Sequence, residues 1–262
     1  MSIPKIVHYV WVGPRALPQE EQRRVAKWRE LLPDWEFRLW DNDALDFSSP
    51  YLRMTFAVRA WSRISDYIRM DALTKFGGVY LDSDVELVRP LDPLLDRAAF
   101  LGFQAGDEMS WEMVNGAVFG AQRGHWLPRL IRTMFDEKFD GRVDVGARSG
   151  PGLLTEILRE HGLSGYSDTP VDVKDVTIFP KRYFYPYNWE EAYSPAVITP
   201  DTFAVHHWAR SWVKSQSEIK ARIRRAALKL FARVAPEYAL RSAQNSCRGT
   251  TAIPNALIRT KP

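Results

Sequence analysis

The sequence contains very little cysteine and no long hydrophobic run. One cysteine, Cys247, occurs among 262 residues, which excludes an internal disulfide and any metal site built from several thiolates. No run of about 18 uninterrupted apolar residues is present, so we predict no membrane-spanning helix. The first residues also lack the charged leader, apolar core and cleavage site of a secretory signal. We therefore expect a globular protein of a reducing compartment, the cytoplasm.

Acidic residues are scarce only in the C-terminal part of the chain. Residues 214–262 contain 11 Lys or Arg and 2 acidic residues, whereas residues 1–213 contain 25 basic and 30 acidic residues. Because 45% of the residues are hydrophobic, the longer part can bury a large core. We expect one domain over 1–213 and a basic extension over 214–262.

The basic extension is typical of a surface-binding helix. Apolar residues recur at helical spacing from Ile219 to Val234, with Lys and Arg on the other faces. Such a helix can lie on an anionic membrane surface, so residues 214–241 are a candidate peripheral membrane anchor. The alternative is that the apolar stripe packs on the protein's own domain. Nucleic-acid binding is disfavoured, because few aromatic residues stand among the charges.

Strand-like and helix-like segments alternate along the domain. This alternation indicates an α/β fold with a mixed, largely parallel sheet of the Rossmann-like kind. We predict strands at 5–12, 36–40, 79–81, 99–103, 116–121 and 202–208, and helices at 18–32, 55–75, 126–135 and 152–161.

Two aspartates follow one of the apolar strands. Asp82 and Asp84 come directly after the predicted strand 79–81, and their side chains point to the same side if the backbone stays extended. Open α/β sheets bind ligands outside the carboxyl ends of their strands. Paired carboxylates suit a hard divalent cation such as Mn²⁺ or Mg²⁺. Both residues are therefore candidate metal ligands, with a solvated turn as the alternative.

A second charged pair lies on the preceding helix. Asp66 and Arg69 are helical neighbours three residues apart, on a face distinct from the apolar stripe. Both side chains can therefore project toward the end of the sheet. The alternative is a surface ion pair that contributes well under about 1 kcal/mol.

These residues belong to a longer pattern. Ser65-Asp66-Tyr67-Ile68-Arg69 and Gly77-Gly78-Val79-Tyr80-Leu81-Asp82-Ser83-Asp84 resemble the D-x-D sugar-binding region of glycosyltransferase family 32, which includes mannosyltransferases and bacterial capsular polysaccharide transferases. Five further segments resemble other landmarks of that family in the same order: 3–13, 32–41, 115–121, 149–155, and 206–208 with 211–212.

The resemblance implies a single GT-A-like domain that transfers a hexose from a nucleotide-diphosphate sugar, depends on a metal and retains the anomeric configuration. It implies that Asp84 binds the metal directly, that Asp82 contacts the ribose and donor sugar, and that His206 or His207 completes the metal shell. The sequence does not decide between the histidines, because neighbours on a strand point opposite ways.

The resemblance also implies further donor contacts. Trp11 is expected to stack on the base, although a core position is the alternative. Asp66 and Arg69 are expected on the ribose or sugar and on the diphosphate, and Ser211 and Trp212 over the phosphates. Asn115 is a candidate contact to the sugar, with a turn before Gly116 as the alternative.

Two other functions fit parts of the sequence. A haloacid-dehalogenase-like phosphatase also has a D-x-D after an apolar strand, but here Val85-Glu86 follows it and two βα units precede it. A non-enzymatic membrane or nucleic-acid adaptor would explain the basic extension and leave the aspartates unexplained. Within the glycosyltransferase hypothesis, UDP-glucose, UDP-galactose and GDP-mannose stay open as donors, as do glycan, lipid-linked and protein acceptors.

Overall fold

The computed structural model describes residues 2–106, 110–139 and 150–209. The strands are β1 (Ile6–Val10), β2 (Glu36–Trp40), β3 (Gly78–Leu81), β4 (Val85–Leu87), β5 (Ala99–Phe103), β6 (Val114–Ala121), β7 (Val171–Val173), β8 (Val176–Phe179) and β9 (Ala204–His206). The α-helices are α1 (Gln19–Leu31), α2 (Pro50–Ala57), α3 (Trp61–Phe76), α4 (Trp126–Glu137) and α5 (Gly150–Glu160). The predicted helix in the basic extension lies outside the described residues, and the boundary at residue 213 stays a prediction.

Seven strands form the main sheet, in the order β2-β1-β3-β6-β5-β8-β7. β1 pairs in parallel with β2 and β3, and β5 with β8, whereas the pairs β3–β6, β5–β6 and β7–β8 are antiparallel. The predicted α/β class with a mixed sheet is confirmed. Parallel and antiparallel pairings are equally frequent among these neighbours, so the sheet is less parallel than expected.

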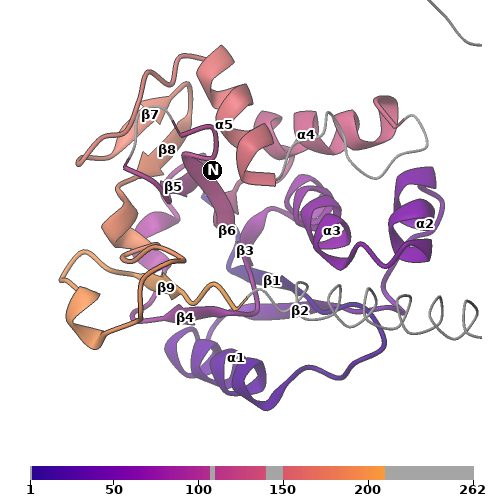
Figure 1. Cartoon of the computed structure of the whole chain (residues 1–262), viewed down its shortest axis with the longest axis horizontal. Coiled ribbons are helices and arrows are strands. Elements are labelled where there is room, and N and C mark those ends of the chain that lie inside the picture. The colour runs from indigo at the N-terminus through magenta and orange to yellow at the C-terminus, as the bar shows by residue number, and fades with distance from the viewer. Residues whose placement is uncertain (1, 107–109, 140–149, 210–262) are drawn as a thin grey trace, which may run out of the picture. The chain divides into compact units, whose positions relative to one another are not determined.

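Two apolar cores cover the faces of this sheet. Alternate residues of β3 enter different cores: Tyr80 contributes to the one that includes α2 to α5, and Val79 and Leu81 to the one that includes α1. Figure 1 shows α2, α3 and α4 on one side of the strands and α1 on the other. This period of two is the expected consequence of the pleat.

The predicted helix at 55–75 is wrong as a single element. The structure has two helices there, and the chain breaks between them at Arg59, which has a positive φ of 59°. The first helix begins earlier than predicted, because the Ser49 hydroxyl accepts from the Leu52 amide and Pro50 follows at the first helical position.

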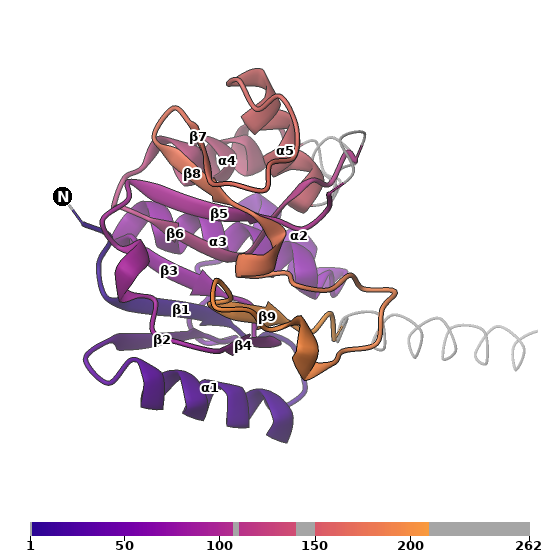
Figure 2. The same cartoon turned by 90° about the vertical axis from the view of Figure 1, so that its left-hand side faces the viewer.

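A small second sheet stands beside the main one. β4 pairs antiparallel with β9, and the Trp28 indole of α1 donates to the Val85 carbonyl at 3.0 Å. The chain therefore passes from β3 through a short turn at Asp82–Asp84 into β4, opposite the end of β9 (Figure 2). β4, β7 and β8, which have three or four residues each, were not predicted.

Candidate metal and donor site

The aspartate pair lies in a turn. The Val85 amide donates to the Asp82 carbonyl at 3.0 Å, so the backbone between them is not extended as predicted. The two carboxylates nevertheless lie together, because the turn brings them to one side at the carboxyl end of β3.

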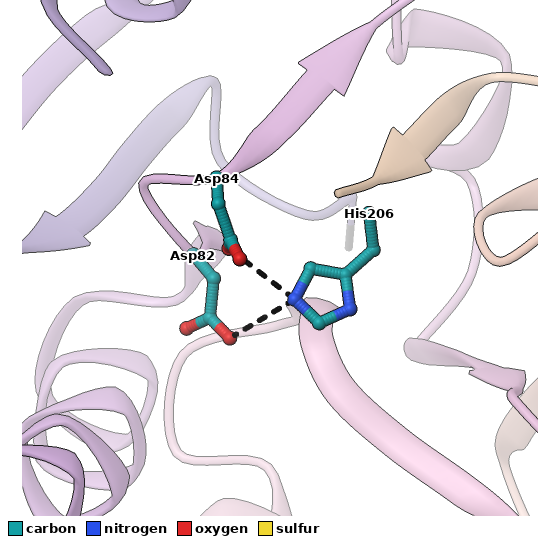
Figure 3. A group of neighbouring side chains, drawn as sticks. All are labelled: Asp82, Asp84 and His206. Carbon is teal, nitrogen blue, oxygen red and sulfur yellow. Dashed lines mark ion pairs between the residues drawn. The ribbon is translucent and has the colours of Figure 1, made fainter. Parts of the chain in front are cut away.

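One histidine completes this group. The ligand atoms of Asp82, Asp84 and His206 lie within 4.8 Å of one another. His206 Nε2 is 3.2 Å from Asp84 Oδ1 and 4.0 Å from Asp82 Oδ2 (Figure 3). The histidine comes from the end of β9, which antiparallel pairing sets opposite Val85.

Each carboxylate has one oxygen held by the protein. Asp82 Oδ1 accepts from Nη2 of Arg69 at 3.0 Å, and Asp84 Oδ2 accepts from the Ala209 amide at 2.8 Å. The other oxygen of each carboxylate is the one nearest His206 Nε2. Two carboxylate oxygens and one imidazole nitrogen fit Mn²⁺ well and Mg²⁺ through the oxygens.

The electrostatics of the group favour a bound cation. Burial acts to raise the pKa of Asp84, but the charge and hydrogen bond of His206 and the Ala209 amide outweigh burial and lower it. Burial acts to lower the pKa of His206, but Asp84 and then Asp82 raise it. The two carboxylates thus favour positive charge beside His206, and a divalent cation bound there would replace a proton on the imidazole.

Arg69 is buried, so the alternative of a surface ion pair is wrong. Its side chain is 5% exposed and donates from Nη1 to Asp66 Oδ1 at 3.0 Å. The guanidinium also lies over the Tyr80 ring, 4.5 Å from its centroid. Burial raises the pKa of Asp66 against the opposing charges of Arg69 and Arg63. The helix face that carries Asp66 and Arg69 is therefore part of the interior next to Asp82.

His207 does not belong to the metal group. Its Nε2 is 2.7 Å from Glu86 Oε2, and its Nδ1 is 3.3 Å from the Tyr187 hydroxyl. Adjacent strand residues face opposite ways, so His207 points away from the aspartates when His206 points toward them. Of the two histidines that the sequence left open as metal ligands, this arrangement favours His206.

The remaining predicted donor contacts divide into three cases. Trp11 follows β1, which is parallel to β3, so it lies at the same edge of the sheet as Asp82, with its Nε1 donating to the Arg15 carbonyl. Asn115 is 7% exposed, and its amide donates to Gln104 and accepts from the Ala117 amide. Ser211 and Trp212 lie outside the described residues. The donor-binding roles of all four stay predictions.

Sequence reasoning missed residues that act through shape or backbone atoms. A Cβ on Gly150, at the start of α5, would lie 2.6 Å from Asp66 Oδ1, and one on Gly116 would lie 3.1 Å from Nη1 of Arg69. Both glycines lie in the motifs that resemble the family, so only their contacts were missed. The Ala209 amide gave no signal, because a backbone donor does not depend on residue type.

Two family models match the chain in succession. A glycosyltransferase sugar-binding region containing the DXD motif matches residues 18–101, and an alpha 1,4-glycosyltransferase conserved region matches residues 120–239. The first match contains both aspartates and Arg69, and the second contains His206.

Curated relatives and a solved structure are also similar. Lactosylceramide 4-alpha-galactosyltransferase of Mus musculus is 28% identical over 237 residues, which covers 87% of this chain and 57% of that protein. Inositol phosphoceramide mannosyltransferase 3 of Schizosaccharomyces pombe is 28% identical over 143 residues, 51% of this chain and 37% of that one. The galactosyltransferase LgtC, solved with donor and acceptor sugar analogs, is 15% identical with a TM-score of 0.47, covering 79% of this chain and 88% of that chain.

The chain thus spans little more than half the length of the mouse relative. The matches favour the glycosyltransferase prediction over the phosphatase and adaptor alternatives. Together the two matched regions include every residue of the aspartate–histidine group and the arginine that holds it. The chain therefore resembles, over two consecutive regions, the glycosyltransferases whose sugar-binding region contains a DXD motif.

Proposed function

We propose that this protein transfers a hexose from a nucleotide-diphosphate sugar with a divalent cation held by Asp82, Asp84 and His206. The observation that supports this proposal most is the distribution of carboxylate oxygens: one of each pair is fixed by Arg69 or by the Ala209 amide, and the other faces His206 Nε2. A site prearranged in this way binds a cation without first reorganising its ligands.

The chemistry requires positive charge at the leaving group. Transfer breaks the bond between the sugar and the diphosphate, and a bound Mn²⁺ or Mg²⁺ would neutralise the departing phosphate as a Lewis acid. In the proposal, Arg69 keeps Asp82 oriented, and Asp66 accepts a hydroxyl hydrogen of the donor. Trp11 stacks on the base, and Ser211 and Trp212 close over the phosphates. No carboxylate is proposed as a covalent nucleophile, and the configuration is proposed to be retained.

The substrates are proposed from the relatives. The names of the mouse and yeast proteins combine a galactose or mannose donor with a ceramide-linked acceptor. We extend this to a UDP- or GDP-hexose donor and a lipid-linked glycan acceptor. UDP-galactose is the first donor to test, with GDP-mannose and UDP-glucose beside it. Membership of family 32 and a preference for Mn²⁺ are part of the same proposal.

A lipid-linked acceptor suits an enzyme at a membrane surface. The described part of the chain has no helix that is long and apolar enough to cross a bilayer. The proposed anchor is the basic stretch 214–241, and the proposed location is the cytoplasmic face of a membrane.

The decisive experiment is a screen of nucleotide sugars with the full chain. A donor that binds should raise the melting temperature in the presence of Mn²⁺, and slow hydrolysis should release its nucleoside diphosphate. Omitting the metal is the matched control. If no UDP- or GDP-hexose is bound or hydrolysed at millimolar Mn²⁺, the proposed function is wrong.

A further inference from the structure

A second carboxylate–histidine pair lies next to the metal group, with Glu86 two residues after Asp84 and His207 one residue after His206. Glu86 Oε2 is 2.7 Å from His207 Nε2, with the two side chains 41% and 15% exposed. In the antiparallel ladder Val85 faces His206 and Glu86 faces Val205. Since side chains alternate, His207 lies on the face of Glu86, and His206 lies on the opposite face.

The apolar pattern of β9 does not decide which histidine faces the aspartates. Phe203, Ala204 and Val205 are all buried, at 6%, 0% and 0% exposure, so both faces of this strand are covered. A shift of the ladder by one residue would exchange the faces of His206 and His207. Because both faces are buried, burial of the apolar residues does not by itself choose between the two histidines, and polar contacts can make that choice.

The second ring nitrogen of His206, Nδ1, has no partner in the described part of the chain that would orient the ring. A ligating histidine usually donates its second ring N–H to a carboxylate or carbonyl. The Nδ1 of His206 is buried, and within residues 2–106, 110–139 and 150–209 it has no hydrogen-bond partner. Apart from the contact of Nε2 with Asp84, the direction of the ring therefore depends on the backbone of β9 and on the rings of Trp208 and Tyr185, whose centroids are 4.2 Å and 5.8 Å away.

His207 supplies the contacts that His206 lacks. Its ring nitrogens are engaged by Glu86 and by the Tyr187 hydroxyl at 3.3 Å. Its backbone amide donates to the Asp84 carbonyl at 3.1 Å. Anchoring His207 on its own face therefore fixes the neighbouring residue on the face of Asp84.

We propose that Glu86 is a positioning residue that holds His207 and thereby selects His206 as the histidine that faces the metal. This inference rests on the proposed metal-dependent function. Because Glu86 is proposed to orient a metal ligand, the loss of Glu86 should lower metal affinity before any donor is bound.

The test is a titration of the full chain with Mn²⁺ alone, in which the electron paramagnetic resonance signal of the free ion measures how much metal is unbound. Glu86→Leu should weaken Mn²⁺ binding about tenfold, the lower end of the range for direct hydrogen-bond partners of metal ligands, because Glu86 acts through His207. Glu86→Gln, which keeps an acceptor for the imidazole N–H, should retain most of the affinity. Glu36→Leu is the matched control, because it removes another strand carboxylate, one that pairs with Arg38, and should leave binding unchanged.

A second variant keeps the inference testable if Glu86→Leu does not fold. His207→Gln should lose a similar share of Mn²⁺ affinity, and combining it with Glu86→Gln should add little, because both act on one contact. At saturating Mn²⁺ the kcat of Glu86→Leu should return close to that of the wild type while the activating metal concentration stays raised.

Two results would overturn the inference and are distinguishable. If the wild type binds Mn²⁺, Asp84→Asn abolishes that binding and folded Glu86→Leu does not weaken it, only the positioning role of Glu86 is wrong. If the wild type itself does not bind Mn²⁺, the proposed metal site fails, and the inference fails with it.

Discussion

Nη2 of Arg69 donates to Oδ1 of Asp82 at 3.0 Å, which joins the middle of α3 to the turn after β3. The same guanidinium donates from Nη1 to Asp66 at 3.0 Å. One planar cation thus sets the direction of two carboxylates. Because the Arg69 side chain is only 5% exposed, water does not replace either contact.

Arg69→Lys should lower kcat/KM about 10–100-fold, because a single ammonium cannot hold both carboxylates in the geometry of a planar fork, and a lost hydrogen bond to a charged group costs about 1.5–3 kcal/mol. Steady-state kinetics with the identified donor measure the loss. Arg63→Lys, on the same helix, is the control and should be nearly silent. Equal tolerance at the two positions would show that Arg69 has no part in the site.

Asp84→Asn should abolish metal-dependent transfer and leave the fold intact. The amide oxygen can still accept from the Ala209 amide, but a neutral amide is a poorer ligand for a hard cation. Turnover and stabilisation by Mn²⁺ with nucleotide should both be lost, whereas exposed Asp96→Asn should retain them. Turnover within about tenfold of the wild type, about 1.4 kcal/mol, would contradict the assigned role.

Gly150→Ala should reduce activity more than it reduces stability. The new Cβ would lie 2.6 Å from Asp66 Oδ1, so the carboxylate that Arg69 holds must move. Gly106→Ala is the control, since its Cβ would meet nothing closer than Tyr166 at 4.0 Å. Donor KM, kcat and thermal unfolding of both variants are the measurements. An unchanged kcat/KM in Gly150→Ala would show that the position of Asp66 is unimportant.

His8 should make the fold sensitive to acid. Burial lowers its pKa from 6.5 to about 4, although the hydrogen bond to the Gly77 carbonyl opposes this. The unfolded chain therefore binds the proton first. The free energy of unfolding falls as the pH drops from about 6.5, and the part of it that depends on His8 is fully lost below about pH 4. The shift in the pKa of His8 corresponds to a loss of roughly 3 kcal/mol in the free energy of unfolding.

Urea unfolding between pH 7 and pH 4 measures the effect of His8. His8→Gln should show a shallower fall in the free energy of unfolding than the wild type, whatever its stability at pH 7. Parallel curves for the two proteins would exclude His8 as the source of acid sensitivity.

Truncation after Ser217 tests the predicted anchor. The shortened chain should lose binding to anionic vesicles, because each basic residue near such a surface contributes on the order of 1 kcal/mol, and should keep donor hydrolysis. Sedimentation with vesicles and hydrolysis are measured on the same samples. If the truncated chain is insoluble, or if the full chain does not bind vesicles, the alternative is favoured that the apolar residues from Ile219 to Val234 pack on the domain.

The sequence by itself determined the elements with strong local patterns. The apolar strand before Asp82, the helix that carries Asp66 and Arg69, and β2 at Glu36–Trp40 follow from periodicity and flanking glycines. The D-x-D and the later histidines indicated the metal group because their chemistry is specific and their order matched a family pattern.

Tertiary structure alone decided which residues meet. The burial of Arg69, the choice of His206 over His207 and the backbone donor of Ala209 depend on how α3, β4 and β9 pack, and residues distant in the chain supply those contacts. The side-chain alternation of β9 allows either histidine to face the aspartates. Only the pairing of β4 with β9 resolves it, because register is a property of two strands and is absent from either sequence taken alone.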